Sequence, residues 1–141
     1  MGSFSNFEAT LAFTFGLVIL FSVIYVVLMI ASNWKLFTKA GEEGWASLIP
    51  VYNLYVTIKI AFSGSKNWLI LFYLVTPIGR LISTGLGLFL SLASLGVSIY
   101  ISYQFVRRYA DAGLSIMALF FPIIVYPIIA FSGKYEYEEY F

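Results

Sequence analysis

The sequence predicts an all-α integral membrane protein with about four transmembrane helices. High apolar content, few charges and long uncharged stretches support this prediction. Hydrophobic residues make up 61% of the 141 residues and charged residues 11%, whereas soluble domains are about 45–50% apolar and about 25% charged. A soluble domain of this size could not bury so much apolar surface, and the same hydrophobicity excludes a disordered chain.

The residue types that are missing limit the chemistry of the chain. Without cysteine, neither a disulfide nor a thiolate metal site can form. Histidine, the commonest metal ligand and general base, is missing as well. The net charge is +1, and no basic tract could neutralise the phosphates of a nucleic acid. We therefore expect no metal, no cofactor and no nucleic-acid partner.

The first predicted span covers residues 11–31, which carry no charge. As a helix this segment would be about 31 Å long, enough to cross a bilayer core of about 30 Å. A cleaved signal peptide would have basic residues ahead of its apolar stretch. Glu8 is the only charged residue ahead of this segment. Lys35 and Lys39 follow it, so the positive-inside rule predicts an external N-terminus and cytoplasmic residues 33–44.

The second apolar segment, residues 45–62, contains polar and helix-breaking residues. Pro50 should kink a helix, and Asn53 and Lys59 also lie inside the segment. The segment is either a kinked span that faces protein, which we favour, or a re-entrant or interfacial segment, because irregular backbone at membrane depth must be covered. Asn53 is expected to hydrogen-bond carbonyls that Pro50 frees, or alternatively to line a polar path.

The third apolar segment, residues 68–106, is too long for one straight helix. It holds one charge, Arg80, and as a single helix would be about 58 Å long, nearly twice the bilayer core. Pro and Gly residues cluster near its middle and predict a break. We expect a short arm over residues 68–82 and a full span over residues 83–106. Whether the short arm crosses, re-enters or lies at the interface sets the number of spans between three and five.

Small residues recur along one face of the full span. Their spacing of three or four residues places them on a single stripe of a helix. Small residues let helix backbones approach closely in lipid, so we expect this stripe to pack against another helix of the chain or a second copy. The stripe consists of Ser83, Gly87, Ser91, Ser94, Ser98 and Ser102.

The last apolar segment covers residues 114–131, where Pro122 and Pro127 should bend the helix. Residues 132–141 alternate aromatic and charged side chains. This alternation is typical of a strand or, as we prefer here, of an interfacial tail with Tyr at the headgroups. Residues 1–141 are thus expected to form a single membrane domain.

Basic residues predict the sidedness of a four-span arrangement. Residues 107–113 would return to the cytoplasm with two arginines, whereas Lys66 and Lys134 would be the only basic residues on the outer loops. This distribution satisfies the positive-inside rule. We therefore expect a multi-pass protein of the cell membrane.

One block of the sequence resembles a known family. It reads K-A-G-x-x-G-W, followed by I-P-x-Y-N. This pattern is similar to the signature of an uncharacterised family of small bacterial multi-pass membrane proteins, catalogued as a domain of unknown function. The resemblance covers about residues 33–131 and implies a cell-envelope or secretion context, without an assigned activity. It is carried by Lys39, Ala40, Gly41, Gly44, Trp45, Pro50, Tyr52 and Asn53.

The chain departs from this family pattern in the third segment. Where the family has a second P-x-x-N, this chain reads P-I-G-R over residues 77–80, and its Trp-led stretch is longer. The same segment matches residues 49–54 weakly. Two broken segments at corresponding positions point towards a midplane site in transporters.

Charges inside apolar segments are candidate functional residues, because a charge at membrane depth costs at least about 2.5–3.5 kcal/mol. Arg80 and Lys59 are the candidates of this kind, and Asn53 is a further polar candidate. Alternatively, Arg80 and Lys59 have no functional role, and their long side chains extend to the lipid headgroups. The sequence suggests no catalytic residue, since a Ser beside a neutral Lys is not indicated.

These observations favour a non-enzymatic scaffold or accessory subunit. It would pack against itself as a homo-oligomer, or against another membrane protein of the cell envelope, within the lipid bilayer. The alternative is a small oligomeric channel, transporter or holin-like pore with Arg80, Lys59 and Asn53 along a polar path. A single copy has few helices with which to enclose such a path.

Overall fold

The computed structural model describes residues 2–138, with side chains from residue 6 onward, and this range is helical without strands. The predicted all-α class is thereby confirmed over these residues. The elements follow in the order α1 (Gly2–Lys39), η1 (Gly44–Leu48), α2 (Pro50–Phe62), α3 (Leu69–Ile82), α4 (Thr84–Arg107), α5 (Ala112–Phe120) and α6 (Pro122–Phe131), where η1 is a 3-10 helix.

Two helices are long and apolar enough to cross a membrane, fewer than the number predicted. They lie over Asn6–Lys39 and Thr84–Arg107. The segments expected to span at residues 45–62 and 114–131 are each broken in two. Their helices α2, α5 and α6 contain 13, 9 and 10 residues, so they are about 20, 14 and 15 Å long. Each is shorter than a bilayer core of about 30 Å.

Proline sets the position of both breaks. Ile49 (φ −102°, ψ 110°) and Phe121 (φ −131°, ψ 57°) leave the helical conformation, as expected for a residue that precedes proline. Pro50 and Pro122 then begin α2 and α6, where the missing N–H is not needed. Each segment is therefore two helices rather than one kinked helix. Pro127, in contrast, lies inside α6.

The break expected in the third segment falls at Ser83. Its backbone is extended, and its Oγ accepts a hydrogen bond from the backbone N–H of Leu86 at 3.1 Å, which caps the start of α4. Pro77 lies inside α3. The weak match between residues 49–54 and 76–81 therefore does not mark two broken segments, because the second proline break is at Pro122.

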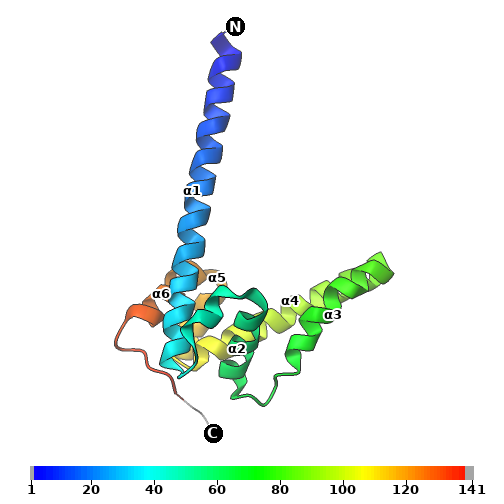
Figure 1. Cartoon of the computed structure of the whole chain (residues 1–141), viewed down its shortest axis with the longest axis vertical. Helices are drawn as coiled ribbons and strands as arrows, with labels where there is room; N and C mark the ends of the chain where they lie inside the picture. Colours follow the sequence, from blue (N-terminus) through cyan, green and yellow to red (C-terminus); the bar gives the residue numbers. More distant parts are fainter. Residues whose placement is uncertain (1, 139–141) are drawn as a thin grey trace.

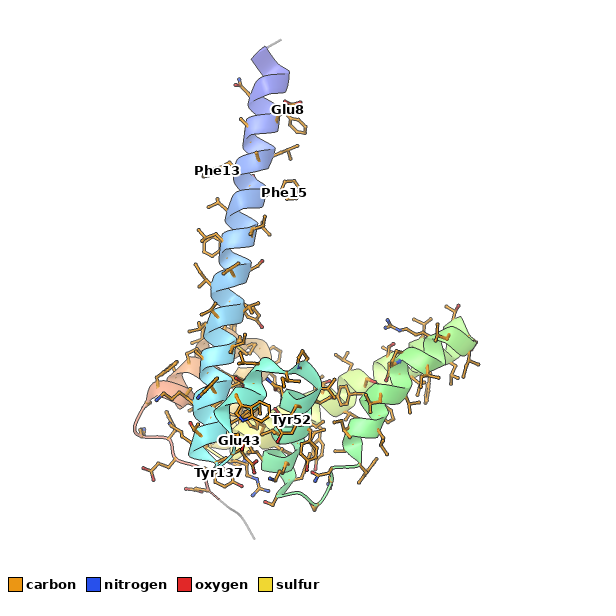
Figure 2. All side chains as sticks on the ribbon, viewed as in Figure 1. Glu8, Phe13, Phe15, Glu43, Tyr52 and Tyr137 are labelled. Atoms are coloured by element: carbon orange, nitrogen blue, oxygen red, sulfur yellow. The ribbon has the colours of Figure 1, made fainter. Side chains whose placement is uncertain are left out.

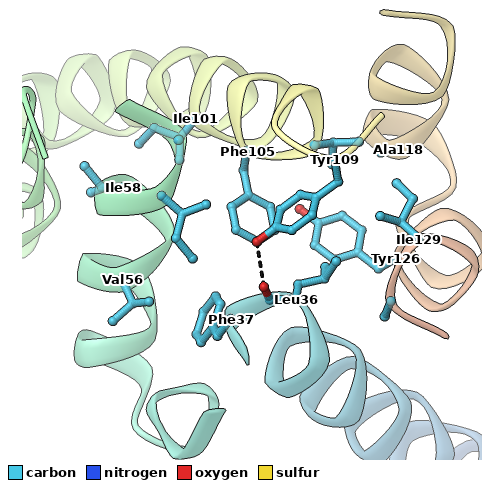
Figure 3. Packing of buried hydrophobic residues seen from close by; sticks show 14 of the residues in the cluster. Leu36, Phe37, Val56, Ile58, Ile101, Phe105, Tyr109, Ala118, Tyr126 and Ile129 are labelled. Atoms are coloured by element: carbon cyan, nitrogen blue, oxygen red, sulfur yellow. Dashed lines mark hydrogen bonds between the residues drawn. The ribbon is translucent and has the colours of Figure 1, made fainter. Parts of the chain in front are cut away.

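The lower end of α1 packs with η1, α2, α5, α6 and the end of α4 into a core bundle (Figure 1). Phe105 is at its centre, edge to face with Phe37 at 6.2 Å between ring centroids and stacked on Tyr126 at 6.0 Å. The Tyr109 hydroxyl donates to the Leu36 carbonyl at 2.7 Å (Figure 3). Burial raises the pKa of Tyr109, so this hydroxyl stays protonated and able to donate.

Two elements leave the core bundle and diverge as a V (Figure 1). One is the shaft, which we define as residues 6–27 of α1, all of them exposed. Figure 2 shows Phe13 and Phe15 on opposite sides of the shaft, with no other part of the chain beside them. The other is the arm, which we define as α3 packed antiparallel against residues 84–98 of α4.

The ends of α1, α2, α4 and α6 gather at one end of the core bundle, which we call the base (Figure 1). Arg108 follows α4 and donates from Nε to the Ala61 carbonyl near the end of α2, at 3.0 Å. Lys39 ends α1 and donates from Nζ to three carbonyls of α6 and the tail. These carbonyls belong to Ile129 at 2.7 Å, Ser132 at 2.9 Å and Tyr135 at 2.7 Å.

Both broken segments leave the base and return to it. A salt bridge of 2.7 Å joins Lys59, in the last turn of α2, to Glu42, which precedes η1. At the other segment, the backbone N–H of Glu138 donates to the Arg108 carbonyl at 2.7 Å and ties the tail to the end of α4, from which the chain leads into α5. Residues 45–62 therefore form two short helices that turn back to the base, and not the one continuous kinked helix that the sequence favoured.

Two lysines lie where the four-span arrangement did not place them. Lys66 follows α2, and its Nζ lies 4.9 Å from the centre of the Phe62 ring. Lys134 follows Ser132, whose carbonyl Lys39 binds. Both are thus at the base together with Lys39, rather than at the opposite end of the molecule.

Candidate functional site

A cavity of about 430 Å³ lies where the two broken segments meet α1, α3 and α4. Pro50 and Pro122, the first residues of α2 and α6, both line it. The remaining walls come from the lower part of α1 and from facing residues of α3 and α4. The cavity therefore lies where both broken segments turn, at the junction of the core bundle and the arm.

Asn53 forms part of the cavity wall while it also stabilises the first break. Its Nδ2 donates to the Ser47 carbonyl at 3.1 Å, and its Oδ1 accepts from Thr57 Oγ1 at 3.3 Å. Its backbone N–H donates to the Ile49 carbonyl at 2.7 Å. Pro50 has no backbone N–H, so the pattern of helical hydrogen bonds is interrupted at this point. The Asn53 side-chain amide instead binds a backbone carbonyl next to the break.

The opposite wall carries two further polar groups. The Tyr73 hydroxyl and Ser98 Oγ are hydrogen-bonded at 2.7 Å, which joins α3 to α4. Asn33 of α1 also lines the cavity, and no described residue hydrogen-bonds to its side-chain amide. The cavity thus presents hydroxyl and amide groups beside apolar walls, a lining that can bind a ligand by hydrogen bonds.

The small-residue stripe of α4 faces α3 of the same chain. Thr76 Oγ1 and Ser94 Oγ are 2.7 Å apart, and Arg80 donates from Nη2 to Ser91 Oγ at 2.8 Å. At Gly87 a Cβ would collide with the backbone of Arg80, so the close approach of the two helices requires glycine there. The polar side chains of the arm are therefore paired between its two helices.

The two ends of the stripe have different roles. Ser83 caps α4 at the tip of the arm. Ser98 and Ser102 lie at the other end, where they line the cavity. One stripe thus runs from the tip of the arm to the candidate site.

Glycine and aromatic residues of the resemblance motif shape the entry into the first broken segment. Gly41 has φ +76°, which favours glycine. A Cβ on Gly44 would lie within the Trp34 ring. Trp45 stacks on Tyr52 with ring centroids 5.1 Å apart.

The other members of that motif contact the core bundle or the cavity. Lys39 binds carbonyls of α6 and the tail, and Ala40 packs against the buried core. Pro50 and Asn53 line the cavity. The motif residues thus build the segment that supports the candidate site.

The structure does not bring the three predicted functional residues together. Arg80 lies near the tip of the arm beside Ser91, and Lys59 lies at the base, paired with Glu42. Only Asn53 is at the cavity. Among the described residues, no three His, Cys, Asp or Glu side chains lie together as metal ligands.

Sequence reasoning missed Asn33 and Tyr73 as residues of the site. Asn33 was detectable as an amide two residues beyond the uncharged stretch that ends at residue 31. Tyr73 gave no comparable signal, because a tyrosine within an apolar segment is also typical of membrane interfaces. Its role depends on Ser98, which lies 25 residues further along the chain.

Comparison with known proteins finds one family. The model described as "Family of unknown function (DUF5684)" matches residues 45–140. The match begins at Trp45, so Lys39 to Gly44 lie outside the matched residues. No curated protein and no solved structure matches the chain.

Proposed function

This chain belongs to that family of unknown function, and we propose that it is a membrane protein of the cell envelope that acts as a non-enzymatic accessory subunit. In this proposal α1 crosses the bilayer once, and the arm crosses it and returns. The 14 residues of α3 form a helix about 21 Å long, so this crossing requires the bilayer to thin around the arm. Both broken segments enter from the base side without crossing. The shaft packs against a second copy or against another membrane protein.

The arrangement of polar and apolar side chains in the arm carries the proposal. Polar groups face one another between α3 and α4, whereas Leu81, Phe89 and Leu92 point outward and are 87%, 68% and 70% exposed. Soluble proteins rarely expose continuous apolar surface on this scale. A bilayer would cover the apolar surface and would favour the internal pairing of polar groups.

The distribution of charge supports an orientation. Every Lys and Arg of the chain except Arg80 lies in the last two turns of α1, α2 or α4, or in the segments that follow α2, α4 and α6. These parts of the chain are at or near the base (Figure 1). The positive-inside rule then places the base in the cytoplasm and the N-terminus outside. This proposal keeps the N-terminal orientation predicted from the sequence, but it has three crossings and cytoplasmic Lys66 and Lys134.

Labelling of single cysteines with a membrane-impermeant maleimide tests this topology, and the natural chain has no cysteine to remove. We expect Lys66→Cys to react only after the membrane is permeabilised. Glu43→Cys, also at the base, is the control and should behave in the same way. Thr84→Cys, at the tip of the arm, should react in intact cells. Labelling of Lys66→Cys in intact cells would support the four-span arrangement and reject ours.

Reconstitution tests the accessory role against the channel alternative. In nanodiscs at low protein density, stepwise photobleaching should show more than one copy per disc, or a membrane partner should co-purify at fixed stoichiometry. Proteoliposomes should show no ion flux above empty vesicles. A flux that is lost in Arg80→Ala would overturn the proposal in favour of a pore. A single copy without a partner would refute the accessory role itself.

A further inference from the structure

The cavity has no part in the accessory role, yet its position, polar groups and apolar walls are those of a binding site. We propose that it binds a small uncharged amphiphile from the bilayer, with an apolar body and a head that offers hydroxyl, ester or amide oxygens. This inference rests on the membrane location proposed above. Three features of the cavity lead to this ligand class.

Two helix starts meet at the cavity. Pro50 and Pro122 begin α2 and α6, and both residues line it. Neither proline has an N–H to donate, and the backbone N–H groups of Asn53 and Val125 already donate to the Ile49 and Phe121 carbonyls. What the two helix starts offer the cavity is the partial positive charge of their dipoles. An electronegative ligand oxygen is therefore favoured between the two starts.

The Asn33 side chain adds an unpaired polar group to the cavity wall. It is half-buried at the cavity wall, and its amide has no hydrogen-bond partner among the described residues. The fully buried, unpaired side-chain atoms among the described residues are Ser47 Oγ and Asn67 Oδ1, so the Asn33 amide is open to the cavity rather than sealed within the protein. A molecule in the cavity that both donates and accepts, as a hydroxyl does, would satisfy this amide.

The lining selects against ions. None of the side chains around the cavity is charged at neutral pH, so an ion would be buried without a counter-charge, at a cost of several kcal/mol. Met29, Ile101 and Phe105 provide apolar wall, and Figure 3 shows the last two at the core. The volume of about 430 Å³ is within the range of about 300–1,000 Å³ typical of small-molecule pockets.

The position of the cavity gives a ligand access from lipid. Met29 lies just below the shaft, and Tyr73 and Ser98 belong to the arm, so the cavity is at the bottom of the V that these elements form (Figure 1). In the proposed orientation the V opens into the bilayer. An amphiphile could then reach the cavity along the membrane with its apolar body in lipid.

Photo-labelling in nanodiscs tests the proposal with three probes of equal chain length. The first is a monoacylglycerol with a diazirine in its acyl chain, and the others are a permanently anionic alkyl sulfonate and a cationic alkyl trimethylammonium with the same diazirine. Mass spectrometry locates the labelled peptides. We expect the monoacylglycerol to label α2, α4 and α6 around the cavity, in competition with the same lipid lacking the diazirine.

Two variants locate the binding. Asn33→Leu preserves side-chain size but removes the amide, and loss of about 1 kcal/mol of hydrogen bonding should reduce saturable labelling about fivefold. Met29→Phe narrows the cavity and should reduce labelling without touching a polar group. Ser22→Leu on the shaft is the matched control and should label like the natural chain.

Several outcomes would overturn the inference. They are equal labelling by the charged probes, labelling that does not saturate, or labelling that both cavity variants leave unchanged. Circular dichroism and size-exclusion profiles of each variant establish that a loss of labelling is not a loss of folding. Absence of cavity labelling together with the expected maleimide pattern would reject the ligand site while leaving the membrane topology intact.

Discussion

The core bundle and the arm are both built from apolar helices, yet they bury opposite kinds of side chain. In the core bundle, Phe37 and Phe105 are 0% and 1% exposed, and apolar packing holds the helices together. In the arm, the contacts between α3 and α4 include hydroxyl pairs and the Arg80–Ser91 contact, while leucines point outward. An apolar helix can therefore associate through its few polar or small residues where its surroundings are apolar.

Truncation of one phenylalanine in each region should give the largest contrast. Phe105→Ala in the core bundle should lower the free energy of unfolding by about 3–5 kcal/mol, because it removes a buried ring and leaves a cavity. Phe89→Ala in the arm, where the ring is exposed, should change it by less than about 0.5 kcal/mol. Thermal unfolding in detergent measures both, and equal losses would contradict the division into two regions.

A pair of glycines provides the next contrast, between the core bundle and the shaft. Gly44→Ala should destabilise by about 1–3 kcal/mol, because the new Cβ overlaps the Trp34 ring and forces a shift. Gly16→Ala on the shaft meets no atom within 4 Å and should strengthen the helix by about 0.5–1 kcal/mol. Unfolding in detergent should therefore show changes of opposite sign. A neutral Gly44→Ala would mean that Trp34 can move freely.

Loss of Lys39, which binds α6 and the tail, should destabilise the protein more than loss of the exposed Lys35. Lys39→Met removes three hydrogen bonds to backbone carbonyls of α6 and the tail, which should cost about 1–3 kcal/mol. Amide hydrogen exchange should accelerate over residues 129–138. Lys35→Met is the control, since Lys35 is exposed, and it should leave exchange unchanged. Similar exchange in both variants would show that the tail is held by its tyrosines instead.

The smallest effect is expected within the arm. Thr76→Val removes the hydrogen bond to Ser94 with almost no change in side-chain shape. It should lower the free energy of unfolding by about 0.6 kcal/mol. The control, Thr14→Val on the shaft, removes a bond within its own helix only. Denaturation in mixed micelles can resolve the difference if the variants are measured side by side. A larger cost than that of Lys39→Met would show that the polar pairs dominate the stability of the arm.

Local sequence signals determined the helical class and the positions of the breaks. Proline disfavours helical backbone in the residue before it, so the segments change direction before Pro50 and Pro122. Ser83 caps α4 where the long third segment had to break. The small residues of α4 indicated a packing face, because their spacing alone places them on one side of a helix.

Tertiary structure alone decided where the broken segments go and what they enclose. The return of both segments to the base depends on contacts such as Lys39 with Ser132, 93 residues apart, and Arg108 with Ala61, 47 residues apart. Neither residue of such a pair indicates its partner, because each side chain alone is compatible with many partners. The cavity likewise exists only because helix starts far apart in sequence meet beside Asn33, and no local pattern encodes that meeting.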